Sequence, residues 1–329
     1  MIYNLPIEPY EERYTEQWIR WIPEAFKKVS RQYTNVLGEP MTSKIEIGKV
    51  LDVYGTNYFK QTQLARLIKI VREDKLSPSD IIFVNDLWFP GIEALQYIRN
   101  MTKGKWKIYG ILHAGTWDIN DFTYKSGMCE WAYHMENGWL TFADKIFVGS
   151  EYHKNLIVNS RIFDEKKIVV TGLPFKQAEV SRFQGKKENI VVFPHRLDEE
   201  KRPDLFDKLK FDLKRKNPHW KFIKTKDVCK TKEDYYQLLG KAKIAVSFAE
   251  QETFGFAMLE AMSNNCRPLV PNALAYKTMD IYNGYRFENY RGAVEMCQRY
   301  IDEDIQWRKG DLLKPYEPLN VIRKMLSEK

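Results

Sequence analysis

The sequence has 329 residues, of which 44% are hydrophobic and 14% aromatic, and this length and composition indicate a globular protein of two domains. It has no apolar run of about 18 residues and no secretory layout at its N-terminus, which argues against a transmembrane span or a signal peptide. The net charge of +8 leaves a polyanionic partner open. We therefore expect a cytoplasmic protein without integral membrane association.

The four cysteines, Cys129, Cys229, Cys266 and Cys297, are far apart in the sequence, and the histidines are not clustered. This spacing indicates neither a disulfide framework nor a zinc site. We therefore expect reduced thiols and no metal.

In chain order, the first helical pattern spans residues 17–30 (QWIRWIPEAFKKVS) and combines aromatic with basic side chains. Such a pattern is compatible with a helix on a membrane surface or with a first-domain helix that packs its aromatic side chains inward. We expect the second, with an interruption at Pro23. Trp18 and Trp21, like Trp131 further along, are expected in the core or as sheet cover.

Short apolar runs then alternate with helical patterns. The runs lie at 81–86, 107–115, 145–150 and 167–172, and after a polar stretch they resume at 189–196, 220–225, 243–250 and 266–272. Strands alternating with helices predict parallel sheets that are covered on both faces. The expected fold class is α/β, with two Rossmann-like domains facing a cleft. The expected limits are 1–178 for the first domain, 179–312 for the second, and 313–329 for a helix that packs back on the first.

Residues 245–262 (AVSFAEQETFGFAMLEAM) run from a strand through a loop into a helix. Gly255 lets the backbone approach a ligand closely, and the N–H groups at the start of a helix can cradle a phosphate. Glu252 and Glu260 flank this helix start, and carboxylates accept hydrogen bonds from sugar and ribose hydroxyls. The segment therefore predicts a binding site for a sugar linked to phosphate.

A second loop, within FPHRLDEEKRPDLF at 193–206, carries Arg196 directly after a strand and Lys201 five positions later. Two cations on one loop can neutralise a diphosphate leaving group, a task that a metal ion performs in other transferases. The alternative is a solvated pair at a helix start. We therefore expect a transfer reaction that needs no metal ion and no cofactor, with the diphosphate as part of the substrate that donates the transferred group.

At these residues the sequence resembles family 4 of the retaining glycosyltransferases, which have the two-domain GT-B architecture. Glu252 to Glu260 matches the E-x7-E motif of that family, and Arg196 with Lys201 matches its diphosphate-binding pair. His113, in YGILHAGTWD, looks like the histidine that the family places over the donor sugar.

The resemblance implies a role for each matching position in binding a nucleotide sugar, such as a UDP- or GDP-sugar. The implied donor-binding residues are Arg196, Lys201, Thr253, Phe254, Gly255, Phe256 and Glu260. His113 and Glu252 would be the catalytic residues near the transferred sugar, and Glu260 would bind the ribose. The resemblance also implies retention of configuration by same-face attack, in which the departing phosphate helps to deprotonate the acceptor.

Polar residues on two loops of the first domain are candidates for the acceptor side. Asn85 and Asp86 close the run IIFVND, and Trp117 and Asp118 follow His113. We expect these side chains to face the cleft, although turn and cap roles also suit them. Residues 1–40 depart from the family, because no glycine precedes Gly38 where a glycine-rich loop normally shapes the acceptor side.

The acceptor is less defined than the donor. The segment FAEQETFGFAMLEAMSNNCRPLVPN also resembles the tRNA-queuosine mannosyltransferases, and the N-terminus resembles phage transferases that modify hydroxymethylated DNA bases. Both indicate a hydroxylated base in phage DNA or tRNA, and a phage-encoded protein would act in the host cytoplasm. Residues 201–232 carry 12 basic and 4 acidic side chains, which suit a polyanion or a solvated helix face.

The sequence is also compatible with other functions. The acceptor is alternatively a lipid, a glycan or a small molecule. A sugar-nucleotide epimerase would need an acid and base pair around the sugar ring, and the sequence offers no convincing pair. A non-enzymatic nucleic-acid-binding protein would leave Glu252 and Glu260 unexplained.

Overall fold

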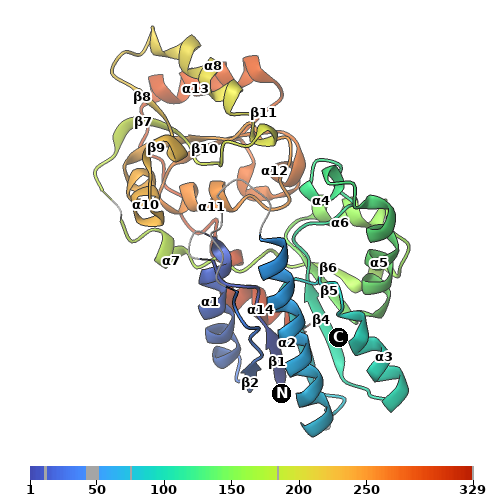
Figure 1. The fold of residues 1–329 in the computed structure, drawn as a ribbon. Helices are drawn as coiled ribbons and strands as arrows, with labels where there is room; N and C mark the ends of the chain where they lie inside the picture. Colours follow the sequence, from blue (N-terminus) through green and yellow to red (C-terminus); the bar gives the residue numbers. More distant parts are fainter. Residues whose placement is uncertain (11–12, 42–51, 75, 184, 328–329) are drawn as a thin grey trace. The chain divides into compact units, whose positions relative to one another are not determined.

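The computed structural model describes residues 1–10, 13–41, 52–74, 76–183 and 185–327. The chain divides into two compact units (Figure 1). Unit 1 comprises Met1–Gly149, His153–Pro174 and Pro318–Lys329, and unit 2 comprises Ser150–Tyr152 and Phe175–Glu317. The C-terminal helix therefore belongs to the same unit as the N-terminus.

Unit 1 is built on a six-stranded parallel sheet with the strand order β2-β1-β3-β4-β5-β6. Its strands are β1 (Ile2–Leu5), β2 (Tyr33–Asn35), β3 (Ile81–Val84), β4 (Lys107–Ile111), β5 (Lys145–Val148) and β6 (Ile168–Val170). All four residues of β1 and of β3 are buried, because strands covered on both faces are apolar throughout rather than alternating. The Asn85 N–H donates to the Leu5 carbonyl at 3.0 Å, so β1 and β3 end together.

Helices follow the strands in alternation, as the sequence predicts. They are α1 (Tyr14–Lys28), α2 (Val53–Asp74), α3 (Glu93–Thr102), α4 (Phe122–Lys125), α5 (Cys129–Phe142), α6 (Glu151–Val158), a short 3-10 turn η1 (Glu165–Lys167) and α14 (Pro318–Ser327). Leu95 of α3 and Trp139 of α5 are buried with Ile82 and Ile108 of the sheet in one hydrophobic core.

Helix α1 packs its aromatic side chains inward, which confirms that interpretation of residues 17–30. Trp18 and Trp21 are each 1% exposed, and the helix packs against α14. The expected interruption at Pro23 is wrong: α1 continues through it, because burial on this face outweighs the hydrogen bond that proline cannot donate. The expectation that Trp131 is buried is also wrong, since its side chain is 48% exposed on α5.

Unit 2 is built on a five-stranded parallel sheet with the order β11-β10-β9-β7-β8. Its strands are β7 (Glu188–Phe193), β8 (Lys221–Lys224), β9 (Ala242–Val246), β10 (Arg267–Pro271) and β11 (Arg286–Phe287). Its helices are α7 (Gln177–Val180), α8 (Pro203–Lys214), α9 (Thr225–Val228), α10 (Lys232–Lys241), α11 (Phe256–Ser263), α12 (Leu274–Thr278) and α13 (Tyr290–Glu303), with 3-10 turns η2 (Glu199–Lys201), η3 (Asp280–Tyr282) and η4 (Lys314–Tyr316).

The second core lies between this sheet and helices α8 and α13. Phe193 and Ile244 of the sheet are buried with Phe206 of α8 and Cys297 of α13. Within the ranges given above, none of the helices combines the length and the apolar character needed to cross a lipid bilayer.

Candidate active site

Unit 2 brings the two predicted donor loops to one edge of its sheet. Residues 194–202 follow β7 and residues 247–255 follow β9, and these two strands are neighbours. Because the strands are parallel, both loops leave the carboxyl edge, where ligands of such sheets bind. The Glu250 N–H donates to the Glu200 carbonyl at 2.8 Å, so the two loops are joined directly.

Glu252 is held through both of its carboxylate oxygens. Oε1 accepts a hydrogen bond from the Gly255 N–H at 2.9 Å, and Oε2 lies 3.4 Å from Nζ of Lys201. Burial alone would raise the pKa of Glu252, but the Lys201 ammonium and the Gly255 N–H outweigh it and lower the pKa. Glu252 is therefore a carboxylate at neutral pH and can accept further hydrogen bonds from hydroxyl groups.

The two cations that are predicted to bind a diphosphate differ in exposure and in their partners. The Lys201 side chain is 8% exposed, and its ammonium donates to the backbone oxygen of Gln251. The Arg196 side chain is 47% exposed and forms ion pairs with Asp198 and Glu200 on its own loop. Lys201 is thus a fixed charge, whereas the charge of Arg196 is shared with two carboxylates.

Gly255 has the backbone conformation that only glycine adopts at low cost. Its φ of +89° lies in the left-handed region, and a Cβ atom there would meet Cε1 of Tyr276 at 3.0 Å. The next residue, Phe256, begins α11, so the glycine turns the chain into that helix. The N–H groups of the first turn of a helix point out of its N-terminal end, and they favour an anion there.

Thr253 and Phe254 shape the same loop from its buried side. The Thr253 carbonyl accepts a hydrogen bond from the Ser150 hydroxyl at 2.7 Å. Phe254 is 1% exposed, and its ring centroid lies 5.1 Å from that of Phe256. These contacts fix the loop backbone, on which the predicted phosphate contacts depend.

Glu260 is bound by two tyrosine hydroxyls that the sequence analysis missed. Tyr235 donates to Oε2 at 2.9 Å and Tyr236 donates to Oε1 at 3.0 Å. Burial raises the pKa of Glu260 despite these bonds and the nearby Lys232. A signal was available in the adjacent tyrosines near the start of α10, but nothing in the sequence connects them to a residue in α11.

His195 is a second residue of this site that the sequence analysis did not single out. Burial and the charge of Lys201 lower the pKa of His195 to about 3, so its imidazole is neutral. Its ring centroid lies 5.2 Å from that of Phe193, and within the described part of the chain Nε2 has no hydrogen-bond partner. Its position directly before Arg196 was the available signal.

In unit 1, His113 makes hydrogen bonds through both ring nitrogens. Nε2 lies 2.8 Å from the Asn85 carbonyl, which can only accept, so Nε2 carries the proton. Nδ1 then accepts a hydrogen bond from the Tyr14 hydroxyl at 3.0 Å, and burial lowers the pKa of the ring. A ligand hydroxyl would therefore reach Nδ1 of His113 only by replacing that of Tyr14.

The candidates that follow β3 lie next to His113. Asn85 is fully buried, and among the described residues neither Oδ1 nor Nδ2 has a hydrogen-bond partner. Asp86 accepts a hydrogen bond from Lys60 at 2.8 Å, and Lys60 also donates to the Trp88 carbonyl at 2.6 Å. The structure thus joins Asn85 to His113 and ties Asp86 to helix α2.

Trp117 and Asp118 are buried within their own loop, at 5% and 4% exposure. The Trp117 ring lies against Gly115, where a Cβ atom would meet it at 2.3 Å. Oδ1 of Asp118 accepts a hydrogen bond from the Asn120 N–H at 3.0 Å, which is a turn role. A role of these two residues toward an acceptor stays a prediction.

A buried ion pair fixes the loop that carries His113. Glu136 is fully buried and accepts hydrogen bonds from the Trp88 indole at 2.8 Å and from the backbone and side chain of Thr116, both at 2.8 Å. Arg161 donates to the same carboxylate from Nε at 2.8 Å and from Nη2 at 2.6 Å. The pair therefore anchors this loop at Thr116.

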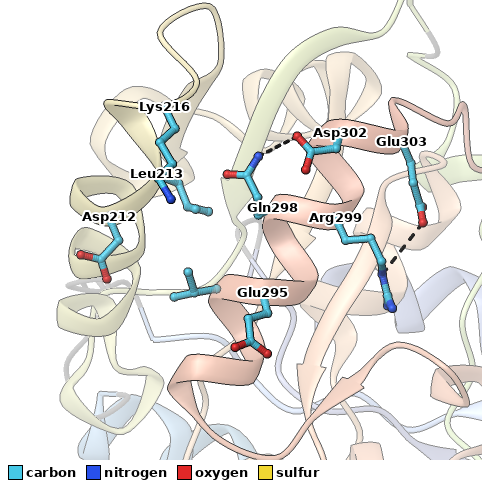
Figure 2. Close-up of a pocket in the computed structure, with 9 residues that line it drawn as sticks. Asp212, Leu213, Lys216, Glu295, Gln298, Arg299, Asp302 and Glu303 are labelled. Carbon is cyan, nitrogen blue, oxygen red and sulfur yellow. Dashed lines mark hydrogen bonds and ion pairs between the residues drawn. The ribbon is translucent and has the colours of Figure 1, made fainter.

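The described residues contain no group of three or more His, Cys, Asp or Glu side chains arranged to hold a metal ion. A hollow of about 540 Å³ lies between α8 and α13 (Figure 2). Its lining residues are Asp212, Leu213, Lys216, Val294, Glu295, Gln298, Arg299, Asp302 and Glu303. None of the predicted site residues lines it, so this hollow is separate from the predicted donor site.

No known family model matches the sequence. Several solved structures are similar to it over nearly their whole length, among them the following three. Sucrose-phosphate synthase from Thermosynechococcus elongatus has a TM-score of 0.69 at 11% identity, covering 98% of this chain and 96% of that chain. A glycosyltransferase from Rickettsia africae has a TM-score of 0.60 at 14% identity, covering 100% of this chain and 99% of that chain. The catalytic domain of starch synthase IV from Arabidopsis thaliana, bound to ADP and acarbose, has a TM-score of 0.59 at 9% identity, covering 100% of this chain and 95% of that chain.

At these identities the likenesses show the fold. Together with the two parallel sheets of six and five strands, they confirm the expected α/β architecture of two Rossmann-like domains, which is that of GT-B proteins.

Proposed function

We propose that this protein is a glycosyltransferase that moves a sugar from a nucleoside diphosphate sugar to a hydroxyl group of an acceptor. The observation that carries the proposal is the arrangement of Glu252, Lys201 and Gly255 at the carboxyl edge of the unit 2 sheet. It combines a carboxylate for sugar hydroxyls, a fixed ammonium and a helix start, which are the groups that a sugar diphosphate requires. The solved structures with the same fold include a glycosyltransferase and a starch synthase bound to ADP, which supports this proposal.

In the proposed donor complex, the diphosphate lies between Lys201 and the first N–H groups of α11. Arg196 joins it by exchanging one of its loop carboxylates for a phosphate oxygen, which its exposed position permits. Glu252 accepts hydrogen bonds from the sugar, and Glu260 accepts them from the ribose. The donor is a UDP- or GDP-sugar.

The proposed reaction retains the configuration of the sugar and needs no metal. The bond between the anomeric carbon and the β-phosphate oxygen breaks, and the acceptor oxygen bonds to that carbon on the same face. The acceptor proton passes to the departing phosphate, so the products are the glycosylated acceptor and a nucleoside diphosphate. Lys201 and Arg196 stabilise the charge that develops on the leaving group, and neutral His113 would contact a sugar hydroxyl.

The proposed acceptor is a hydroxylated base of a nucleic acid, in phage DNA or in tRNA. The positive net charge of +8 supports a polyanionic acceptor, and the sequence resemblances point to a hydroxymethylated or similarly modified base. A base in duplex DNA would have to leave the helix stack to reach the donor.

The donor site is tested with Glu252→Ala and Arg196→Ala. Each is expected to lower turnover by about 100-fold or more, because each removes a charge that acts on the donor. Glu250→Ala is the matched control, since Glu250 is an exposed acid two positions away that pairs with Arg202. Transfer is measured as nucleotide release from a panel of UDP- and GDP-sugars, with circular dichroism to confirm folding. Near-normal turnover in a folded Glu252→Ala protein would refute the site assignment.

The acceptor is tested by mass spectrometry of nucleosides from hydroxymethylated DNA, and separately from tRNA, after incubation with the protein and the donor panel. A gain of one hexose or pentose on a base is the expected result. Nucleotide release from a donor without any gain on a base would reject the nucleic-acid acceptor and leave the transferase proposal standing.

A further inference from the structure

The positive charge of this protein is concentrated in one segment of unit 2. Residues 208–232 carry ten Lys or Arg and two Asp, a net charge of 10 − 2 = +8, and the whole chain also has a net charge of +8. The other residues are therefore neutral in sum. A charge that is scattered over a surface serves solubility, whereas one confined to a single segment produces a local positive potential.

This segment, residues 208–232, forms one continuous border of the unit 2 fold, the basic edge. It begins in the second half of α8, passes through β8 and α9, and ends at the start of α10 (Figure 1). In the described sheet, β8 is the outermost strand and pairs with β7 alone, so its other side is not covered by a further strand.

Half of the basic side chains of this edge make no contact with a partner group in the described part of the chain. Five of them are exposed and have no hydrogen bond, ion pair or ring contact with any described residue: Lys210, Arg215, Lys216, Lys226 and Lys230. By contrast, Lys224 pairs with Asp207 at 2.8 Å and Lys221 lies 3.4 Å from Glu188. Exposed cations that lack internal partners are available to an external anion.

The basic edge has a defined limit and leads toward the donor site. On one side it meets the acidic side chains of α13 that line the hollow of Figure 2, among them Glu295 and Asp302. At its other end it reaches the start of α10, where Lys232 acts electrostatically on Glu260. A polyanion on this edge would therefore end beside a residue of the proposed donor site within the same unit.

We propose that the basic edge binds the phosphodiester backbone of a nucleic acid and holds it for modification; this inference rests on the proposed transfer to a nucleic-acid base. A membrane surface fits less well. The two most exposed apolar side chains of the segment are Phe211, 82% exposed, and Val228, 59% exposed, and they lie on either side of β8 in the chain. An interfacial anchor needs a contiguous apolar face, whereas a nucleic acid needs spaced cations.

The test compares two charge-reversal variants of the full chain. The first, Arg215→Glu, Lys226→Glu and Lys230→Glu, changes three unpaired cations of the basic edge. The matched control, Lys103→Glu, Lys105→Glu and Lys107→Glu, changes three exposed lysines of unit 1 and alters the net charge by the same amount. Binding to fluorescein-labelled single-stranded and duplex DNA with unmodified bases is measured by anisotropy over a series of salt concentrations.

The basic-edge variant is expected to bind DNA at least about tenfold more weakly, with the slope of log K against log salt reduced by about 2 to 3, because each lost phosphate contact removes about 0.7 to 0.9 of slope. The control is expected to behave like the parent protein. Unchanged binding in the basic-edge variant, or equal losses in both variants, would overturn the proposal. Binding to phosphatidylserine vesicles without binding to DNA would overturn it as well.

Two further measurements separate the possible failures. If circular dichroism shows that the charge-reversed variant is misfolded, the neutral variant Arg215→Gln, Lys226→Gln and Lys230→Gln replaces it. The neutral variant must then also bind DNA more weakly than the parent protein. Nucleotide release in the absence of acceptor is measured on the same proteins. If the basic-edge variant loses DNA binding and no donor is turned over, the basic-edge proposal is supported and the transferase proposal is rejected. If a donor is turned over and the basic-edge variant binds DNA as the parent protein does, the transferase proposal is supported and the basic-edge proposal is rejected.

Discussion

The contact between Glu252 and Lys201 allows a quantitative test of the proposed donor site. The two side chains are 17% and 8% exposed, and their charged atoms lie 3.4 Å apart. Removing one partner of a fully buried ion pair costs about 3 to 5 kcal/mol. Lys201 would keep its contacts with Gln251, so we expect Glu252→Gln to lower the free energy of unfolding by about 2 kcal/mol.

The assay is a double-mutant cycle of Glu252→Gln and Lys201→Met, with unfolding followed by circular dichroism in urea. The double variant is expected to lose less stability than the sum of the single variants, by about 1 to 2 kcal/mol, because the second change removes a charge that the first left unpaired. Since the folded state lowers the pKa of Glu252, its contribution is present above the unfolded pKa of about 4.3 and is lost as the pH falls.

The stability gap between the parent protein and Glu252→Gln should therefore narrow from about pH 7 toward about pH 3. Additive losses in the cycle, or a gap that stays constant over this range, would show that the Lys201 charge does not act on Glu252. The same variants must also bind a nucleoside diphosphate more weakly, which calorimetric titration measures independently of turnover.

Two further predictions concern the frame of the site. Gly255→Ala is expected to lower the free energy of unfolding by about 1 to 2 kcal/mol and to abolish binding of a nucleoside diphosphate in calorimetry. Gly284→Ala is the control, because Gly284 has a similar φ of +81° and open space around it. It should lose the same stability but keep the binding of the nucleoside diphosphate. Glu136→Gln is expected to lower stability by about 3 to 5 kcal/mol in thermal denaturation, because it leaves the Arg161 charge buried without its carboxylate, whereas the exposed Glu130→Gln should be neutral within about 0.5 kcal/mol.

The sheets could be predicted from the sequence because their signal is local. A strand buried on both faces must be apolar along its length, and runs such as IIFV and KIFV show this directly. The loop with Glu252 and Gly255 was readable for a similar reason, since a strand, a glycine and a helix start follow one another within a few positions. The interruption predicted at Pro23 failed because the tertiary packing of α1 outweighs a local preference.

The partners of the site residues could not be predicted, because they are distant in the chain. Tyr14 lies 99 positions from His113, and Tyr235 lies 25 positions from Glu260. No periodicity or motif links such residues; only the sheet order brings them together. The protonation states could not be predicted either, because they also depend on the folded structure. His195, for example, is neutral because it is buried and lies near the charge of Lys201.

The contacts of Glu260 bear on how a ribose could be bound. An ionised carboxylate offers about four lone-pair sites, and the two tyrosine hydroxyls occupy one on each oxygen. Two sites remain, which equals the number of hydroxyl donors on a ribose, so both could bind without displacing either tyrosine. Burial raises the pKa of Glu260, whereas each added hydrogen bond favours the ionised form, so the tyrosines prepare the carboxylate for the proposed ligand before it arrives.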